Sequence, residues 1–260
     1  MSPRGLDVRL SLDLSLQQHA DEDLGSDTGA VILLNAQSGE ILVMASHPTF
    51  DPNQLAEIGD GLNTDPSKPL INRATQGLYP TGSLLDPFAK LLFGDKNLNM
   101  QEWKKVYETF GLSRAPAFEL PIAESISSPP LESFHVSALQ VALAGAVLSH
   151  HGTIPAPILA SAVNTPNDGW VVLSAQGTPI EAVPAPAADE AAQSLIGNGE
   201  GFWSFSAKAS EKESTVTWYV AGTPPDWQGT PLIVVVVVEE SNLRLAQFIG
   251  SGLLKSAMNP

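Results

Sequence analysis

The stretch YPTGSLLDPF, residues 79–88, contains the residues of this chain that are best placed for nucleophilic chemistry. Ser83 follows a Pro-Thr-Gly turn and stands at the start of an apolar run that is typical of a helix. A serine hydroxyl is a weak nucleophile and needs a neighbouring base. Asp86 comes three residues later, where a helix places a partner on the same face. The pair therefore poses the question of whether Asp86 can activate Ser83.

Asp86 is a poor base for this purpose. An aspartate carboxyl ordinarily has a pKa of about 4, so at neutral pH it accepts a proton weakly unless burial raises that pKa. Its negative charge also opposes the oxyanion that forms beside a serine during acyl transfer. Lys90 shares a helical face with Ser83, but its backbone would lie about 10 Å further along the axis. Neither residue is a ready substitute for a positioned lysine.

The rest of the chain predicts the elements that must hold Ser83. Residues 28–48 are typical of a β-hairpin with a turn around 35–39, and 231–238 of a buried strand. We expect a sheet whose first and last segments meet, with helices on both faces. An alternating stretch at 8–12 is followed by helical spacing through 16–24. Further helices are predicted from 83, and at 100–111, 136–152, 189–196 and 241–257; further strands at 169–175, 201–210 and 215–224; a polar loop at 51–70; and irregular chain at 113–133.

Composition excludes several classes of function. The formal net charge is −15 and Lys plus Arg total 13, so the chain lacks the basic face that nucleic acid or an anionic membrane requires. It has no cysteine, which excludes disulfides and thiolate metal sites. His150 and His151 have no further ligands at workable spacing, so we expect no metal and no cofactor. No apolar run is long enough for a transmembrane helix, and MSPRGLDV lacks the apolar core of a signal peptide.

Several separate segments together resemble the transpeptidase domain of penicillin-binding proteins. SLDLSLQQHADEDL is similar to the family's D-x-x-L-Q-like helix, and the hairpin GEILVMASHPTFDPN to its T-G-E-I-L-A-M-x-S-x-P-x-F-D-P-N. LINRATQGLYPTGSLLDPF is similar to N-R-A followed by Y-x-P-G-S-x-x-K, and HVSALQVALAGAVLSHHG to a later family helix. The resemblance is collinear from about residue 7 to about residue 250 and matches at 16–17, 39–45, 48, 50–53, 72–74, 79 and 82–83.

The resemblance implies a catalytic pattern that this chain does not keep. Family members acylate the serine of S-x-x-K with help from the lysine, an S-x-N and a K-[ST]-G. Here Asp86 stands at the lysine position, and KAS at 208–210 replaces K-T-G. No S-x-N is found, because Ser125, Ser127 and Ser128 fall on the wrong side in the family's order. The resemblance thus implies Ser83 as a vestigial or residual nucleophile, Lys208 as a cleft lysine, and Ala209 and Ser210 as substrate-binding positions.

The three altered motifs together favour a pseudoenzyme. The resemblance implies an α+β fold of the β-lactamase and transpeptidase type, with a mainly antiparallel sheet, helices on both faces and a reduced helical subdomain. We expect one domain over 7–257 with that subdomain at about 84–150, and linker or cloning residues at 1–6. The expected role is binding or scaffolding in peptidoglycan synthesis, outside the membrane, with any anchor outside this chain. Partners would be peptidoglycan stem peptides or cell-wall and division proteins, and the resemblance also admits β-lactams.

Two rival functions stay open at this point. One is an active serine D-Ala-D-Ala transpeptidase or carboxypeptidase that penicillin acylates at Ser83, with unusual helper residues. The other is a sensor that binds β-lactams or stem peptides without a covalent bond. Each distinctive side chain also has a structural reading. Ser83 suits an N-cap or turn, Asp86 the first turn of a helix, and Lys208 a solvated strand, while Trp203, Trp218 and Trp227 suit a core better than a recognition surface.

Overall fold

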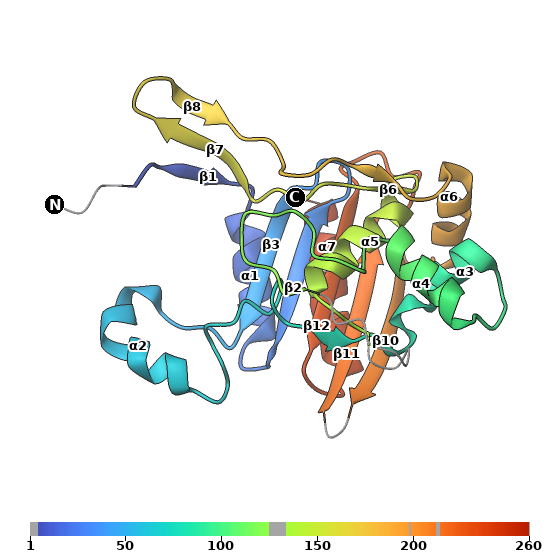
Figure 1. Ribbon diagram of the computed structural model, residues 1–260, viewed down its shortest axis with the longest axis horizontal. Helices are drawn as coiled ribbons and strands as arrows, with labels where there is room; N and C mark the ends of the chain where they lie inside the picture. The colour runs from blue at the N-terminus through green and yellow to red at the C-terminus, as the bar shows by residue number, and fades with distance from the viewer. Residues whose placement is uncertain (1–4, 125–133, 198, 212–213, 260) are drawn as a thin grey trace.

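A five-stranded antiparallel sheet forms the centre of the computed structural model, which describes residues 5–124, 134–197, 199–211 and 214–259 (Figure 1). The strand order is β10-β11-β12-β2-β3. Strand β12 pairs with β2, so the last segment of the sheet meets the first, as the sequence predicts. The strands are β2 (Gly29–Asn35), β3 (Ile41–His47), β10 (Trp203–Glu211), β11 (Ser214–Gly222) and β12 (Leu232–Val238).

The central strand β12 shows why this sheet is covered on both faces. Its seven residues, LIVVVVV, are all buried. Successive side chains of a strand point to opposite faces, so a continuous apolar run needs two covering layers. Val235 and Val237 belong to the core on the side of helix α5 (Ala138–Ser149), and Val234 and Val236 to the core shared with helices α1 (Leu14–Leu24) and α7 (Leu243–Met258). The predicted α+β fold with helices on both faces is confirmed.

Helix α5 is buried along its whole length, which its small side chains allow. At Gly145 an added Cβ would lie 2.1 Å from Cδ1 of Ile233, so the helix backbone sits directly on the sheet. Its N-terminus carries a capping box, in which Ser137 accepts from the Gln140 backbone and Gln140 reaches back to the backbone of Ser137. This close seating fixes the helical layer against the sheet.

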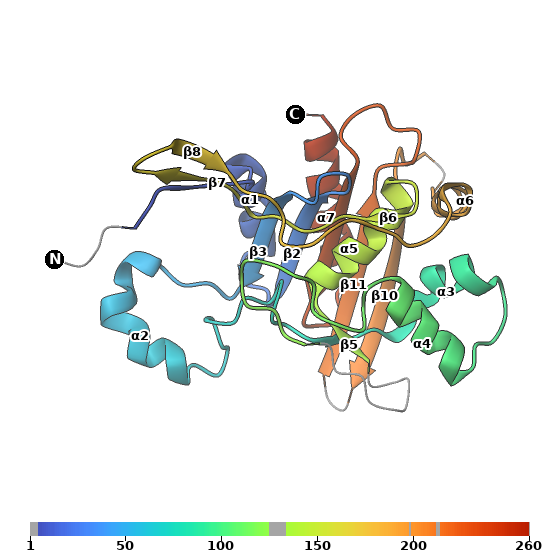
Figure 2. The same cartoon turned by 45° about the horizontal axis from the view of Figure 1, so that its top comes forward.

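Shorter elements surround this body. Figure 2 shows a small three-stranded sheet, order β1-β7-β8, that projects from it near the N-terminus. The remaining elements are β1 (Val8–Leu10), η1 (Pro52–Gln54), α2 (Leu55–Thr64), β4 (Tyr79–Pro80), η2 (Gly82–Leu85), α3 (Asp86–Phe93), α4 (Met100–Thr109), β5 (His135–Val136), β6 (Thr153–Ile154), β7 (Ala160–Thr165), β8 (Gly169–Val172), β9 (Ile180–Glu181) and α6 (Ala185–Ser194).

Three sequence expectations need correction. The polar segment 51–70 is not a loop throughout, because it contains α2, whose Ile58 and Leu62 are half-buried. The predicted strand at 169–175 belongs to the projecting sheet, where it pairs with the unpredicted β7 rather than with the main sheet. Helix α6 begins at Ala185, earlier than predicted, because proline is tolerated in the first turn of a helix.

Candidate functional site

Ser83 lies in a 3-10 turn that is pressed against the edge strand β10. The preceding residue, Gly82, has φ of +52°, and a Cβ added there would lie 2.5 Å from the carbonyl oxygen of Lys208 and 3.0 Å from Cβ of Ala209. Both the backbone conformation and the space therefore require glycine. The PTG turn thus places the exposed Ser83 beside the outer edge of the main sheet.

Ser83 and Asp86 are neighbours through their backbones. The N–H of Asp86 donates to the carbonyl oxygen of Ser83, and Asp86 is the first residue of α3. Both side chains are exposed, and within the described residues the Ser83 hydroxyl makes no hydrogen bond. Partial desolvation raises the pKa of the Asp86 carboxyl. Asp86 occupies the first helical turn as expected, and Ser83 lies within the 3-10 turn; the N-cap positions of that turn and of α3 are held by Thr81 and Leu85, neither of which makes a side-chain capping hydrogen bond.

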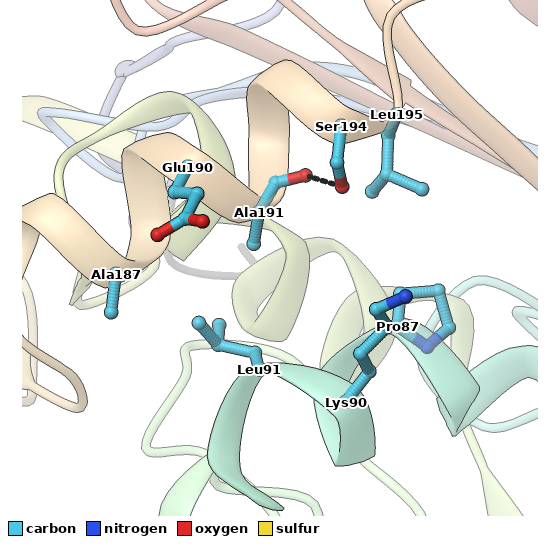
Figure 3. Close-up of a pocket in the computed structure, with 8 residues that line it drawn as sticks. All are labelled: Pro87, Lys90, Leu91, Ala187, Glu190, Ala191, Ser194 and Leu195. Carbon is cyan, nitrogen blue, oxygen red and sulfur yellow. Dashed lines mark hydrogen bonds between the residues drawn. The ribbon is translucent and has the colours of Figure 1, made fainter. Parts of the chain in front are cut away.

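Lys90 does not replace the missing lysine. Its Nζ lies 2.9 Å from Oδ1 of Asp95, beyond the C-terminal end of α3. Figure 3 shows it in a groove of about 270 Å³ between α3 and α6, together with Pro87 and Leu91. This groove is lined by residues from 87–91 and 187–195 and does not include Ser83. The lysine is therefore engaged on another side of the helix.

The face of β10 that packs toward α3 and α5 is apolar. Trp203, Ala207 and Ala209 are buried in the core on this side, and Phe205 packs against it. The ring of Phe205 meets that of Phe88 from α3 edge-on, with centroids 6.1 Å apart. Aromatic rings and methyl groups thus occupy the side of the strand on which acyl transfer would need a cation and a hydroxyl.

Lys208 projects to the other face of the sheet, which corrects the expectation of a cleft lysine. Cross-strand partners share a face, and the register pairs Lys208 with Thr217 and Ser206 with Tyr219. Tyr219 packs in the core beside α7. The even-numbered residues of β10, Lys208 among them, therefore face α7 and not α3. The Nζ of Lys208 donates to the Ser241 hydroxyl at 2.8 Å, and the side chain is solvated. The KAS sequence therefore lies on the predicted edge strand, but the alternation of side chains along β10 directs Lys208 away from the face that packs on α3.

A pocket of about 400 Å³ is lined by Gly82 and Leu85 on either side of Ser83 in the chain, although Ser83 itself is not a lining residue; we call it the Ser83 pocket. Helix α4 supplies one wall with Trp103, which is half-buried, and Tyr107, whose ring stacks on Phe134 with centroids 3.5 Å apart. Burial raises the pKa of Tyr107 to about 12, so its phenol stays neutral. None of the lining residues is charged; they are Pro80, Thr81, Gly82, Leu85, Trp103, Tyr107, Ala209 and Ser210. Ala209 and Ser210, the predicted substrate-binding positions, thus line this pocket.

A network of buried side chains around the partly exposed Glu239 holds the segment before Ser83 in place. Glu239, just after β12, accepts from Nε of Arg73 at 2.7 Å and from the Tyr79 hydroxyl at 2.8 Å. Trp218 packs edge-on against Tyr79 and donates from Nε1 to the carbonyl oxygen of Pro80 at 3.0 Å. Sequence reasoning matched Arg73 and Tyr79 to family motifs but did not single out Glu239. An acid directly after a fully buried strand is the signal that could have found it.

The tryptophans and histidines have mainly structural surroundings. Trp203 and Trp218 are fully buried, which confirms the core assignment, and Trp227 is half-buried in the loop after β11. His151 is paired with Asp189, with Nδ1 2.9 Å from Oδ1. The described residues contain no group of three or more potential metal ligands. Ser125, Ser127 and Ser128 lie outside the described residues.

The tyrosines give a spectroscopic prediction. The chain has three, and burial raises the pKa of each: Tyr107 and Tyr219 to about 12, and Tyr79 further, helped by the charge of Glu239. The unfolded chain loses these protons near pH 10, so stability must fall as pH rises from about 10 to about 12. An ultraviolet titration of the folded protein should show little tyrosinate at about pH 11, where a tyrosine with a pKa of about 12 is roughly one-tenth ionised. A tyrosinate midpoint near pH 10 with intact circular dichroism would contradict this packing.

Comparison with known proteins shows similarity to one family of cell-wall proteins in both sequence and fold. Residues 29–98 match the sequence model of the penicillin binding protein transpeptidase domain. Over its length the chain superposes on the penicillin G acyl-enzyme complex of penicillin-binding protein A from M. tuberculosis, with a TM-score of 0.83, 20% identity and coverage of 99% of this chain and 82% of that one. The chain has the fold of a penicillin-binding protein transpeptidase domain. A structure of the D,D-transpeptidase domain of a peptidoglycan glycosyltransferase from Eggerthella lenta is similar as well, with a TM-score of 0.78, 20% identity and coverage of 98% and 83%.

Curated relatives of this transpeptidase-type domain are matched over shorter stretches. The peptidoglycan D,D-transpeptidase MrdA of Escherichia coli K12 is 38% identical over 92 residues, which are 32% of this chain and 14% of that protein. MrdA of Acinetobacter baumannii is 33% identical over 118 residues, 44% of this chain and 17% of that protein. The chain therefore matches a small part of these relatives. Within its described residues no helix is long and apolar enough to cross a membrane.

Proposed function

We propose that this domain is a non-catalytic member of the transpeptidase class that acts as a binding or scaffold module in peptidoglycan synthesis. The observation that carries the proposal is the surrounding of Ser83. Its hydroxyl has no hydrogen-bonded base within the described residues, and the residue one turn later is the acid Asp86. Within the described residues Ser83 is held in position but lacks the hydrogen-bonded base that acyl transfer requires.

The chemistry explains why this combination disables the site. Attack by a serine requires a group that takes the hydroxyl proton and positive charge or donors that stabilise the oxyanion. Lys90 is paired with Asp95, and Lys208 donates to Ser241 from the other face of the sheet. The site-facing side of β10 carries rings and methyl groups instead. Loss of a positioned base alone costs on the order of 10²- to 10⁴-fold in rate.

The proposed setting follows from the relatives. The proteins that share the first part of the chain are named peptidoglycan D,D-transpeptidases. A domain that keeps their fold and loses the base can still present a shaped surface to stem peptides or to cell-wall and division proteins. We propose that it does so on the extracytoplasmic side of a bacterial membrane, held there by a segment that is not part of this chain. We also propose the domain division given by the sequence: one domain over residues 7–257, with a helical subdomain inserted at about 84–150.

Incubation with a labelled penicillin tests the loss of catalysis. Intact-mass measurement should show no stoichiometric adduct, because within the described residues no base is hydrogen-bonded to the Ser83 hydroxyl. Ser83→Ala is the control for any weak label. Asp86→Lys should not restore acylation, since the β10 side of the site stays apolar. An adduct on the original protein that Ser83→Ala abolishes would establish the rival reading, an active serine acyltransferase, and end this proposal.

A further inference from the structure

The groove between α3 and α6 shares no lining residue with the Ser83 pocket and has a surface of its own (Figure 3). Most of this surface is aliphatic. The aliphatic lining residues are Pro87 and Leu91 on α3, and Ala187, Ala191 and Leu195 on or directly after α6. All five are half-buried, so a partner that covers the groove removes apolar surface from water.

Two exposed charges of opposite sign stand on the two walls of this groove. Lys90 lies on α3 and Glu190 on α6, and Figure 3 shows Leu91 and Ala191 between them. Within the described residues the Glu190 carboxylate makes no ion pair. Lys90 contacts Asp95, but the side chains of this pair are 62% and 80% exposed. Such a pair contributes little, and an ammonium group has two further donors, so both charges are available to a partner.

One cation and one anion beside an apolar centre make this surface complementary to itself. In a two-fold dimer the same patch serves both subunits, so each contact occurs twice. A two-fold axis that crosses the mouth of the groove midway between Lys90 and Glu190 brings Lys90 of each copy to Glu190 of the other. The two pairs of helices then face each other with their aliphatic side chains between them, as pairs of helices do in a four-helix bundle.

We propose that α3 and α6 form a self-complementary interface through which this chain associates with a second copy of itself. The helices have eight and ten residues. A pair of this length covers roughly 300 Å², from a rise of 1.5 Å per residue and a width of about 10 Å per helix. A standard interface buries about 800 Å² per partner, so we expect a weak, reversible dimer. The proposal does not depend on whether Ser83 is catalytic.

Sedimentation-velocity ultracentrifugation of the whole chain tests the interface by charge reversal. The original protein should show a reversible monomer–dimer equilibrium with a dissociation constant of about 0.1 mM. Glu190→Lys places lysine opposite lysine twice in the dimer, and Lys90→Glu places acid opposite acid twice. Each variant should therefore raise the dissociation constant about tenfold or more. The double variant restores both pairs and should dimerise like the original protein. An equimolar mixture of the two single variants should form a heterodimer, because every lysine then faces an acid.

Charge changes elsewhere on the surface separate local pairing from net charge. Glu57→Lys on α2 and Lys104→Glu on α4 alter the net charge by the same amounts at exposed positions. They should leave the dissociation constant within about twofold. Circular dichroism checks that each variant is folded. Where a reversed charge disturbs folding, Lys90→Met and Glu190→Gln remove the charge instead, and each should weaken the dimer about threefold.

Three results would overturn this inference. One is a chain that stays monomeric at about 1 mM. Another is a double variant that dimerises no better than the single ones. The third is a dimer that Glu190→Lys and Lys90→Glu affect no more than Glu57→Lys and Lys104→Glu do, since it would then form through another surface. A penicillin adduct on Ser83 would overturn the proposed function and leave this interface untouched.

Discussion

Trp218→Ala lowers the free energy of unfolding by about 3–5 kcal/mol, the usual cost of truncating a large buried aromatic side chain. The indole is fully buried between the sheet and the segment before Ser83. Its removal leaves a cavity, takes the edge-on partner from Tyr79 and leaves the carbonyl oxygen of Pro80 without its donor. Since whole domains are stable by only about 5–15 kcal/mol, this single change removes a large fraction of the total.

Urea denaturation followed by far-ultraviolet circular dichroism measures this loss without depending on tryptophan fluorescence. Trp218→Phe, which keeps a ring but loses the donor, should fall between the original protein and the alanine variant. The matched control is Trp170→Ala in the projecting sheet, where a half-exposed indole lies under Arg9 and its loss should cost no more than about 1 kcal/mol. If both alanine variants lost the same amount, the packing assigned to Trp218 would be wrong.

Arg73→Met is expected to cost about 3 kcal/mol of unfolding free energy. The Arg73 side chain is 7% exposed and donates to Glu239 and to the backbone carbonyls of Ser67 and Lys68. Its loss leaves these acceptors without a donor and leaves the acid near the Tyr79 hydroxyl. Because the Glu239 side chain is 34% exposed, water replaces part of the lost solvation, and this keeps the expected cost at the lower end of the range for buried pairs.

A double-mutant cycle separates the ion pair from the packing of Arg73. Glu239→Gln removes the charge, so the double variant should recover about 1 kcal/mol or more of the loss caused by Arg73→Met. Lys104→Met is the matched control, because Lys104 is exposed and lies 3.7 Å from Glu108, and it should cost under about 1 kcal/mol. Equal losses for Arg73→Met and Lys104→Met would show that the network does not fix the segment before Ser83.

The elements with strong local patterns could be predicted from the sequence. Local sequence pattern is enough to predict the valine run of β12, the hairpin of β2 and β3, and the apolar helix α5. Burial on two faces requires a continuous apolar run, which is visible in the sequence itself. Helix α2 could not be predicted as easily, because glycines and acids conceal the spacing of its few apolar residues. Ser83 and Asp86 were also found, since a turn and a helix start have local signatures.

The surroundings of Ser83 depend on information that is not local. The side to which Lys208 points is fixed by the register of β10 on β11, and the KAS motif alone does not report it. The alternation of Trp203, Phe205, Ala207 and Ala209 was visible in the sequence and is the better guide to this face. The wall of Trp103 and Tyr107 exists only because α4 docks beside the 3-10 turn, which is a tertiary contact.

The seven-residue strand β12 also has a consequence for how this chain reaches its native state. Its two neighbours are β11, just before it in the chain, and β2, near the opposite end of the sequence. Pairing over such a separation is slow, because the connecting chain must first be ordered. Until β2 is in place, an uncharged run of high β-propensity has one open edge, which is the signature of a segment that pairs between chains. The pairing of β12 with β2 is therefore the step of folding that closes this edge.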